Sequence, residues 1–148
     1  MRSGDYTITM DADRMDIAAI HAFLTKSYWS PGIALATVER AMANSLCFGL
    51  FFRQSQVGLA RVITDKATFA YLADVYVLEA HRGQGLCKRL LEAIQGHPDL
   101  QGLRRFMLAT RDAHGLYRQF GFEPLANPSR MMEIVKPNVY RAHEGGDE

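Results

Sequence analysis

The chain reads DVYVLEAHRGQGLCKRLL from Asp74 to Leu91, and this stretch decides the fold. An apolar strand runs into a glycine-rich turn, and the turn runs directly into a helix whose apolar residues recur at helical spacing. Such a turn directs several backbone N–H groups towards one point, where the helix dipole adds partial positive charge. Gly83 and Gly85 allow a phosphate to approach the backbone, because neither carries a Cβ. The stretch therefore predicts a phosphate-binding turn, with Arg82 and Lys88 as its cationic partners.

The residues that follow Gly85 narrow the identity of the phosphate ligand. A P-loop ends in Gly-Lys-Ser or Gly-Lys-Thr, whereas here Leu86 and Cys87 follow the glycine. A dinucleotide-binding fingerprint needs a third glycine and usually lies near the start of its domain. The residues alone leave two interpretations open, a turn that holds another phosphate-bearing ligand and a glycine-rich connection that binds nothing.

Apolar patterning in the rest of the chain predicts a sheet with helices on both faces. Strands are expected at residues 6–10, 46–53, 57–64, 69–78 and 105–109, at 121–123 and at 131–135. Helices are expected at 15–24 and 35–44, from Gly85 to Gly96, and at 113–120. Asp11 and Asp13 offer N-cap oxygens to the first helix, and residues 54–56 connect two strands as a hairpin. This order predicts an α/β domain with a mixed, mainly antiparallel sheet.

Length and charge limit the kind of protein further. With 148 residues we expect one domain over residues 1–142 and a disordered tail over 143–148. A formal net charge of +1 gives no reason to expect nucleic acid or a membrane as partner. Cys47 and Cys87 form neither a disulfide framework nor a metal-ligand cluster. The start of the chain does not resemble a secretory signal, so we expect a soluble, cytoplasmic protein without a metal.

A second motif lies downstream, where the chain reads DAHGLYRQFGF from Asp112 to Phe122. It resembles the Ala-x-x-x-Tyr-x-x-x-Gly-Phe element of the GCN5-related N-acetyltransferases, the GNAT superfamily. The stretch from Arg82 to Cys87 resembles the Gln/Arg-x-x-Gly-x-Gly/Ala signature with which the same family holds the pyrophosphate of CoA. Cys87 departs mildly from that signature, since cysteine is still small. The two elements stand in the family's order and cover roughly residues 70 to 125.

The resemblance implies an acyl-CoA N-acyltransferase fold with acetyl-CoA as the acyl donor. By the same resemblance, the strand before the turn pairs with the pantetheine arm through Val75, Tyr76 and Val77. The pyrophosphate would be held by the turn and the first helical turn, which comprise Arg82, Gly83, Gln84, Gly85, Leu86, Cys87 and Lys88. The acetyl group would pass directly to an amine in a ternary complex, with the oxyanion at the N–H of Val77.

Tyr117 is the expected general acid, because the tyrosine of this family element commonly protonates the departing thiolate. Its spacing from Ala113 and Phe120 also predicts an apolar helix face in which the ring packs in the core. Both roles are compatible, because a buried phenol needs a hydrogen-bonding partner and the thiolate could be that partner. Cys87 as an acyl-carrying nucleophile is a weaker alternative that would imply ping-pong kinetics.

Asp74 is the candidate general base, because it interrupts an otherwise apolar strand. A carboxylate buried without partners would be costly and would have a raised pKa. The alternative is a structural carboxylate paired with the backbone or with Arg61, which lies in the middle of another strand. His114 is a further candidate base, whereas His21 is expected to be structural.

Tyr28 and Trp29 lie between the first two helices, where the family builds its acceptor pocket. These aromatic residues could stack on a substrate or surround a cation, and they could equally close the edge of the core. Arg61 is grouped with them as a substrate-binding candidate.

The prediction is an acetyltransferase whose acceptor is a small-molecule or peptide amine, and a homodimer is left open. Two rivals remain, a module that senses acyl-CoA without catalysis and an acetyltransferase toxin that acts on charged tRNA. The near-neutral charge weighs against the second, because tRNA binding calls for a basic face.

Overall fold

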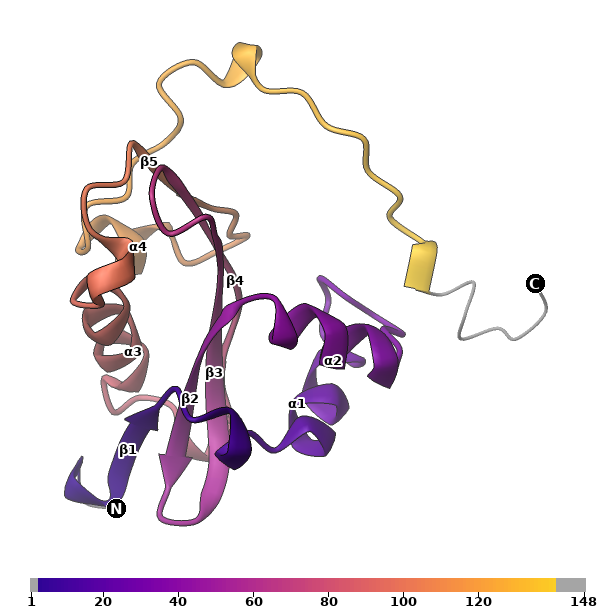
Figure 1. Ribbon diagram of the computed structural model, residues 1–148, viewed down its shortest axis with the longest axis vertical. Helices are drawn as coiled ribbons and strands as arrows, with labels where there is room; N and C mark the ends of the chain where they lie inside the picture. Colours follow the sequence, from indigo (N-terminus) through magenta and orange to yellow (C-terminus); the bar gives the residue numbers. More distant parts are fainter. Residues whose placement is uncertain (1–2, 141–148) are drawn as a thin grey trace.

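A five-stranded sheet forms the centre of the computed structural model, which describes residues 3–140 (Figure 1). The strands follow one another in sequence order across the sheet, as β1 (Tyr6–Thr9), β2 (Leu46–Phe52), β3 (Ser55–Thr64), β4 (Phe69–Val77) and β5 (Arg105–Leu108). Every neighbouring pair is antiparallel except β4 and β5, which are parallel. The expected mixed, mainly antiparallel sheet is therefore confirmed.

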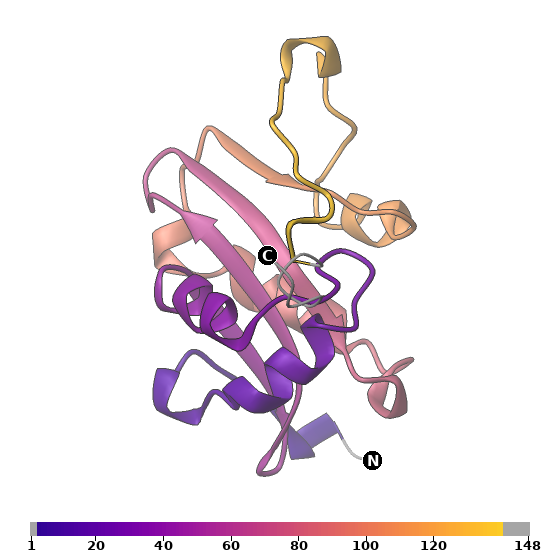
Figure 2. The same ribbon diagram turned by 90° about the vertical axis from the view of Figure 1, so that its right-hand side faces the viewer.

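Helices cover both faces of this sheet (Figures 1 and 2). On one face lie α1 (Ile17–Leu24) and α2 (Leu35–Ala43), and on the other lie α3 (Leu86–Gln95) and α4 (His114–Arg118). Each pair buries an apolar cluster against the sheet, one built around Ile20 and the other around Leu90, and both of these side chains are fully buried. No helix among residues 3–140 has the length and hydrophobicity that a membrane span would need.

Two expected boundaries are shifted, one by helix capping and one by the backbone conformation of a turn. The first helix begins at Ile17 rather than at Met15, because Asp16 is its N-cap and accepts a hydrogen bond from the N–H of Ala19. Asp11 instead caps a separate 3₁₀ turn, which precedes the helix. The β2–β3 hairpin turns at residues 53–54 rather than 54–56, since Arg53 adopts a left-handed φ of 54°.

The two strands expected after α4, at 121–123 and 131–135, are absent from residues 3–140, so this prediction is wrong. Residues 119–136 contain one 3₁₀ turn, Pro128–Arg130, and no strand. The chain runs out from the sheet as an arm and reaches the α1–α2 side again at Tyr140, which is half-buried there (Figure 1). A strand needs a paired edge, and this arm lies away from its own β5. The predicted tail at 143–148 lies outside the described residues.

Candidate functional site

β4 separates from β5 halfway along its length. The two strands pair only from Phe69 with Arg105 to Leu72 with Leu108. Directly afterwards, Asp74 adopts a left-handed φ of 52°, and the pairing of β4 with β3 shifts register at this bulge. Among residues 3–140, no strand therefore pairs with the β5 side of residues 73–77.

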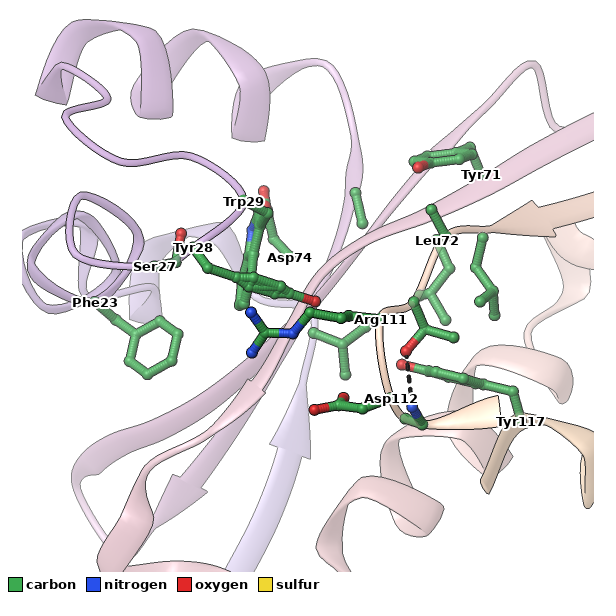
Figure 3. A pocket seen from close by; sticks show the side chains of 16 residues that line it. Phe23, Ser27, Tyr28, Trp29, Tyr71, Leu72, Asp74, Arg111, Asp112 and Tyr117 are labelled. Carbon is green, nitrogen blue, oxygen red and sulfur yellow. Dashed lines mark hydrogen bonds between the residues drawn. The ribbon is translucent and has the colours of Figure 1, made fainter. Parts of the chain in front are cut away.

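A cavity of about 720 Å³ occupies this opening (Figure 3). Its walls come from β4, from the loop that follows β5, from the loop after α1, and from α4. The cavity brings together five residues that the sequence singled out, namely Tyr28, Trp29, Asp74, Val75 and Tyr117. Candidates that lie far apart in the chain thus meet in one place.

The glycine turn lies after the C-terminal end of β4 and leaves open space in front of its backbone. Gly83 and Gly85 have φ values of 79° and 73°, which favour glycine, and a Cβ built on either would meet no atom within 4 Å. Gly85 is also the N-cap of α3, and no side chain caps that helix. The first N–H groups of a helix lack intrahelical partners, so here they remain available to an anion. The main chain of the turn therefore suits a phosphate group.

The side chains of Arg82 and Gln84 hydrogen-bond to neighbouring strands of the protein. The Nε of Arg82 donates to the carbonyl oxygen of Val77 at 2.8 Å. The amide nitrogen of Gln84 donates to the phenol oxygen of Tyr6 at 3.2 Å. These bonds tie the turn to β4 and β1, although Arg82 and Gln84 stay exposed, and Lys88 is a further exposed cation on the first turn of α3.

Two further predicted cofactor residues have side chains in the core. The ring of Tyr76 stacks on Phe23, with ring centroids 3.8 Å apart, and Leu86 is buried beneath α3. Only the backbone of these two residues can then serve a ligand. Cys87 is half-buried, and burial raises the pKa of its thiol, which keeps it protonated and does not favour a nucleophilic role.

Tyr117 packs in the core and also lines the cavity, so both predicted roles are compatible with its position. Its residue surface is 9% exposed, and its hydroxyl makes no hydrogen bond to any other residue among 3–140. Burial, with smaller contributions from Cys87 and Tyr28, raises the pKa of the phenol to about 12. The phenol therefore keeps its proton at neutral pH and presents an unused donor.

Asp74 has both carboxylate oxygens engaged. One accepts a hydrogen bond from Nε of Arg61 at 2.7 Å, and the other accepts from the indole N–H of Trp29 at 2.8 Å. Arg61 also donates to the hydroxyl of Ser45 at 3.0 Å and does not line the cavity. The predicted pairing of Asp74 with Arg61 is confirmed, while the substrate-binding role of Arg61 finds no support in its position.

Tyr28 and Trp29 do not close the edge of the core. They are 49% and 42% exposed, and their rings meet edge to face at 5.1 Å on the cavity wall. The guanidinium of Arg111 lies 3.8 Å from the centre of the Tyr28 ring. Figure 3 shows these two side chains next to each other. The position of these two aromatic residues suits contact with an acceptor.

Sequence reasoning missed Arg111 and Asp112, which line the cavity directly after β5. The sequence did contain a signal for them, because both residues follow a predicted strand and ligands often bind at the carboxyl ends of parallel strands. The two predicted histidines lie elsewhere. His114 is exposed and lines a second cavity, whereas a ring nitrogen of His21 hydrogen-bonds the carbonyl oxygen of Ile33 at 2.9 Å, as expected for a structural role.

Comparison with known proteins gives consistent matches. The model of an acetyltransferase (GNAT) domain matches residues 43–124. A crystal structure of a GNAT-family protein from Xanthomonas campestris pv. campestris is 51% identical, covers 91% of this chain and 96% of its own, and superposes with a TM-score of 0.89. A protein of Gibberella zeae named as an acetyltransferase is 36% identical in an alignment of 138 positions, and the match covers 77% of this chain and 76% of that protein. A structure from Clostridium acetobutylicum, solved with acetyl-CoA, shares the fold at 14% identity, with a TM-score of 0.64 over 88% of this chain and 94% of its own.

Proposed function

The chain belongs to the acetyltransferase (GNAT) family, and on that premise we propose that it transfers an acetyl group from acetyl-CoA directly to an amine. The observation that carries this proposal is the free backbone edge of β4 at residues 73–77. This edge leads from the cavity that contains Tyr117 to the turn at Gly83 and Gly85. Acetyl-CoA could therefore lie along this edge, with its acetyl end in the cavity and its pyrophosphate at the turn.

The main chain would hold the donor. N–H groups of the glycine turn and of the first turn of α3 would bind the pyrophosphate, and Lys88 would add a positive charge. The free edge at Val75 and Val77 would hold the pantetheine arm through its peptide groups. Acetyl-CoA would supply an activated thioester, which makes the acyl carbon susceptible to an amine.

The side chains would handle the acceptor and the proton. Tyr117 would hold a proton on its phenol oxygen, where a leaving thiolate needs one. Tyr28 and Trp29 would contact the acceptor, and the carboxylate of Asp112 would attract an amine to the cavity. The protonated phenol of Tyr117 in the cavity favours an enzyme over a module that only senses acyl-CoA, because sensing needs no proton donor.

A panel of amines with acetyl-CoA tests the proposal, with release of free thiol as the measurement. We expect at least one class of amine to increase thiol release well above the hydrolysis rate. Binding of CoA without thiol release for any amine, peptide or charged tRNA would instead support the sensing module. Release with charged tRNA alone would support the toxin.

Asp74→Asn is expected to lower the melting temperature and to leave the acidic limb of the pH–rate profile in place. The change removes the negative charge beside Arg61, and stranding one partner of a buried pair costs about 3–5 kcal/mol. For a domain of this size, that loss corresponds to a shift of roughly 10 °C. Thermal denaturation and a pH–rate profile on the same variant are the two measurements.

Asp112→Asn is the matched control, because Asp112 lines the same cavity, is exposed, and has no ion pair among residues 3–140. We expect its melting temperature to equal that of the wild type. If Asp74→Asn instead keeps its stability and loses the acidic limb, Asp74 is the general base. If only Asp112→Asn loses that limb, the base is Asp112.

A further inference from the structure

Arg111 places a positive charge on the wall of the cavity that contains Tyr117. Among the described residues 3–140, it is the only lysine, arginine or histidine that lines this cavity. Its guanidinium makes no ion pair within that range, and it contacts the ring of Tyr28 at 3.8 Å from the ring centre. A cation in a cavity without a charged partner is available to an anionic group of a ligand.

The contact with Tyr28 orients Arg111 and leaves hydrogen-bond donors free. A guanidinium is planar and carries five N–H donors in a fixed fork. One aromatic ring can meet only one face or one edge of that plane, so donors remain for a ligand. Such a fork matches the two oxygens of a carboxylate, which it can bind through two parallel hydrogen bonds.

Asp112 adds the opposite charge on the same wall. Its carboxylate is exposed and makes no ion pair in the part of the chain that the structure describes. Figure 3 shows the side chains of Arg111 and Asp112 extending from the loop after β5 to the same side. The other carboxylate of the cavity, that of Asp74, is already paired with Arg61. The wall therefore presents one positive and one negative charge to a ligand.

Aromatic rings and size limit the ligand further. Phe23, Tyr28 and Trp29 line the cavity, and the ring of Trp29 lies 6.1 Å from that of Phe23 and 5.1 Å from that of Tyr28, between centroids. Such rings suit an apolar or aromatic carbon skeleton. The volume of about 720 Å³ is in the range of sites for small molecules.

We propose that the acceptor is a small amino carboxylate with an apolar or aromatic side group, and that Arg111 binds its carboxylate. The inference rests on the proposed acetyl transfer, because it names the class of acceptor for the same cavity. An amine without an anionic group would leave the guanidinium without a counter-ion once the ligand excludes water. A phosphate ester carries nearly two negative charges and would meet a single guanidinium beside the carboxylate of Asp112, so it fits less well.

The charges on the wall also suit the release of the product. The nitrogen of the neutral amine forms a bond to the acetyl carbon, the C–S bond of the thioester breaks, and one amine proton ends on the thiol of CoA. The product, an N-acetyl amino carboxylate, keeps its negative charge and can no longer become an ammonium. Asp112 then attracts it no longer, which favours its departure.

Pairs of acceptors that differ in one charge test the proposal. Phenylalanine, leucine and their β-amino homologues are each compared with the corresponding primary amide, with thiol release as the measurement. The amide keeps the amine and the side group and removes the negative charge. We expect kcat/KM to be about tenfold or more higher for the acid in at least one pair, the scale of hydrogen bonds to a charged group.

Arg111→Gln should remove this preference. We expect the KM of the acid to rise about tenfold or more and the KM of the amide to stay unchanged. Arg111→Lys should restore part of the preference, because it returns the charge without the fork of donors. Arg118→Gln is the matched control, since it removes the same charge from an exposed arginine on α4 that does not line this cavity, and the preference should persist.

Three results would overturn the proposal, and they are distinguishable. Amides that react as well as their acids would refute the carboxylate site and leave acetyl transfer to amines in place. A preference that persists in Arg111→Gln would refute the role of Arg111. Absence of thiol release with every amine would refute the inference together with the proposed function. Arg111→Met, which also removes the charge, is the second variant if Arg111→Gln fails to fold.

Discussion

Replacement of Tyr117 by phenylalanine should lower kcat about a hundredfold or more and leave the affinity for CoA unchanged. The change removes the hydroxyl that lines the cavity and keeps the ring that packs in the core. Loss of a positioned general acid typically costs this much rate. Because burial raises the pKa of this phenol to about 12, it should cause no fall in rate at mildly alkaline pH. Steady-state kinetics and CoA calorimetry are the measurements.

Tyr71→Phe is the matched control for this variant, because it removes another phenol hydroxyl near the same cavity, and no role is assigned to that residue. We expect it to turn over at nearly the wild-type rate. The melting temperature of Tyr117→Phe should also stay near that of the wild type, since its hydroxyl has no hydrogen-bonding partner among residues 3–140. Wild-type turnover in Tyr117→Phe would leave this residue with a packing role alone.

Replacement of Gly85 by glutamate should weaken CoA binding by a factor of about a hundred or more, which is at least ~2.7 kcal/mol of binding free energy. The new side chain would enter the open space in front of the first turn of α3. Its carboxylate would repel a pyrophosphate at the point where the N–H groups favour an anion. Isothermal titration calorimetry with CoA measures the effect.

Gly102→Glu is a closely matched control. Gly102 has a φ of 69°, close to the 73° of Gly85, and a Cβ on either glycine meets no atom within 4 Å. Both variants should therefore lose a similar stability, on the order of 1–2 kcal/mol, from a side chain at positive φ. Only the variant in the glycine turn should lose CoA binding. Unchanged affinity in folded Gly85→Glu would show that this turn does not hold the pyrophosphate.

Local patterns in the sequence predicted the elements that build the site. The glycines at 83 and 85 and the apolar spacing after them located α3 and its uncapped start, since both features depend on neighbours in the chain. The same kind of pattern placed Tyr117 on a short helix with one face towards the core. The charge of Asp74 in an apolar strand was sufficient to suggest Arg61 as its partner.

Local sequence patterns could not predict contacts between residues that are far apart in the chain. Trp29 as the second partner of Asp74, and Arg111 against Tyr28, depend on how the loop after α1 meets the end of β5. The left-handed conformation of Asp74, which separates β4 from β5, likewise reflects pairing with β3.

The sequence by itself determined where the helices and most strands lie, and it predicted a phosphate-binding turn and, through the family resemblance, a proton-donating tyrosine. The tertiary structure decided which of these residues share a cavity, and that residues 131–135 do not pair within their own sheet. The physical reason is that helix spacing and turn conformation depend on residues a few positions apart. A strand is complete only when another edge, however distant, supplies its hydrogen bonds.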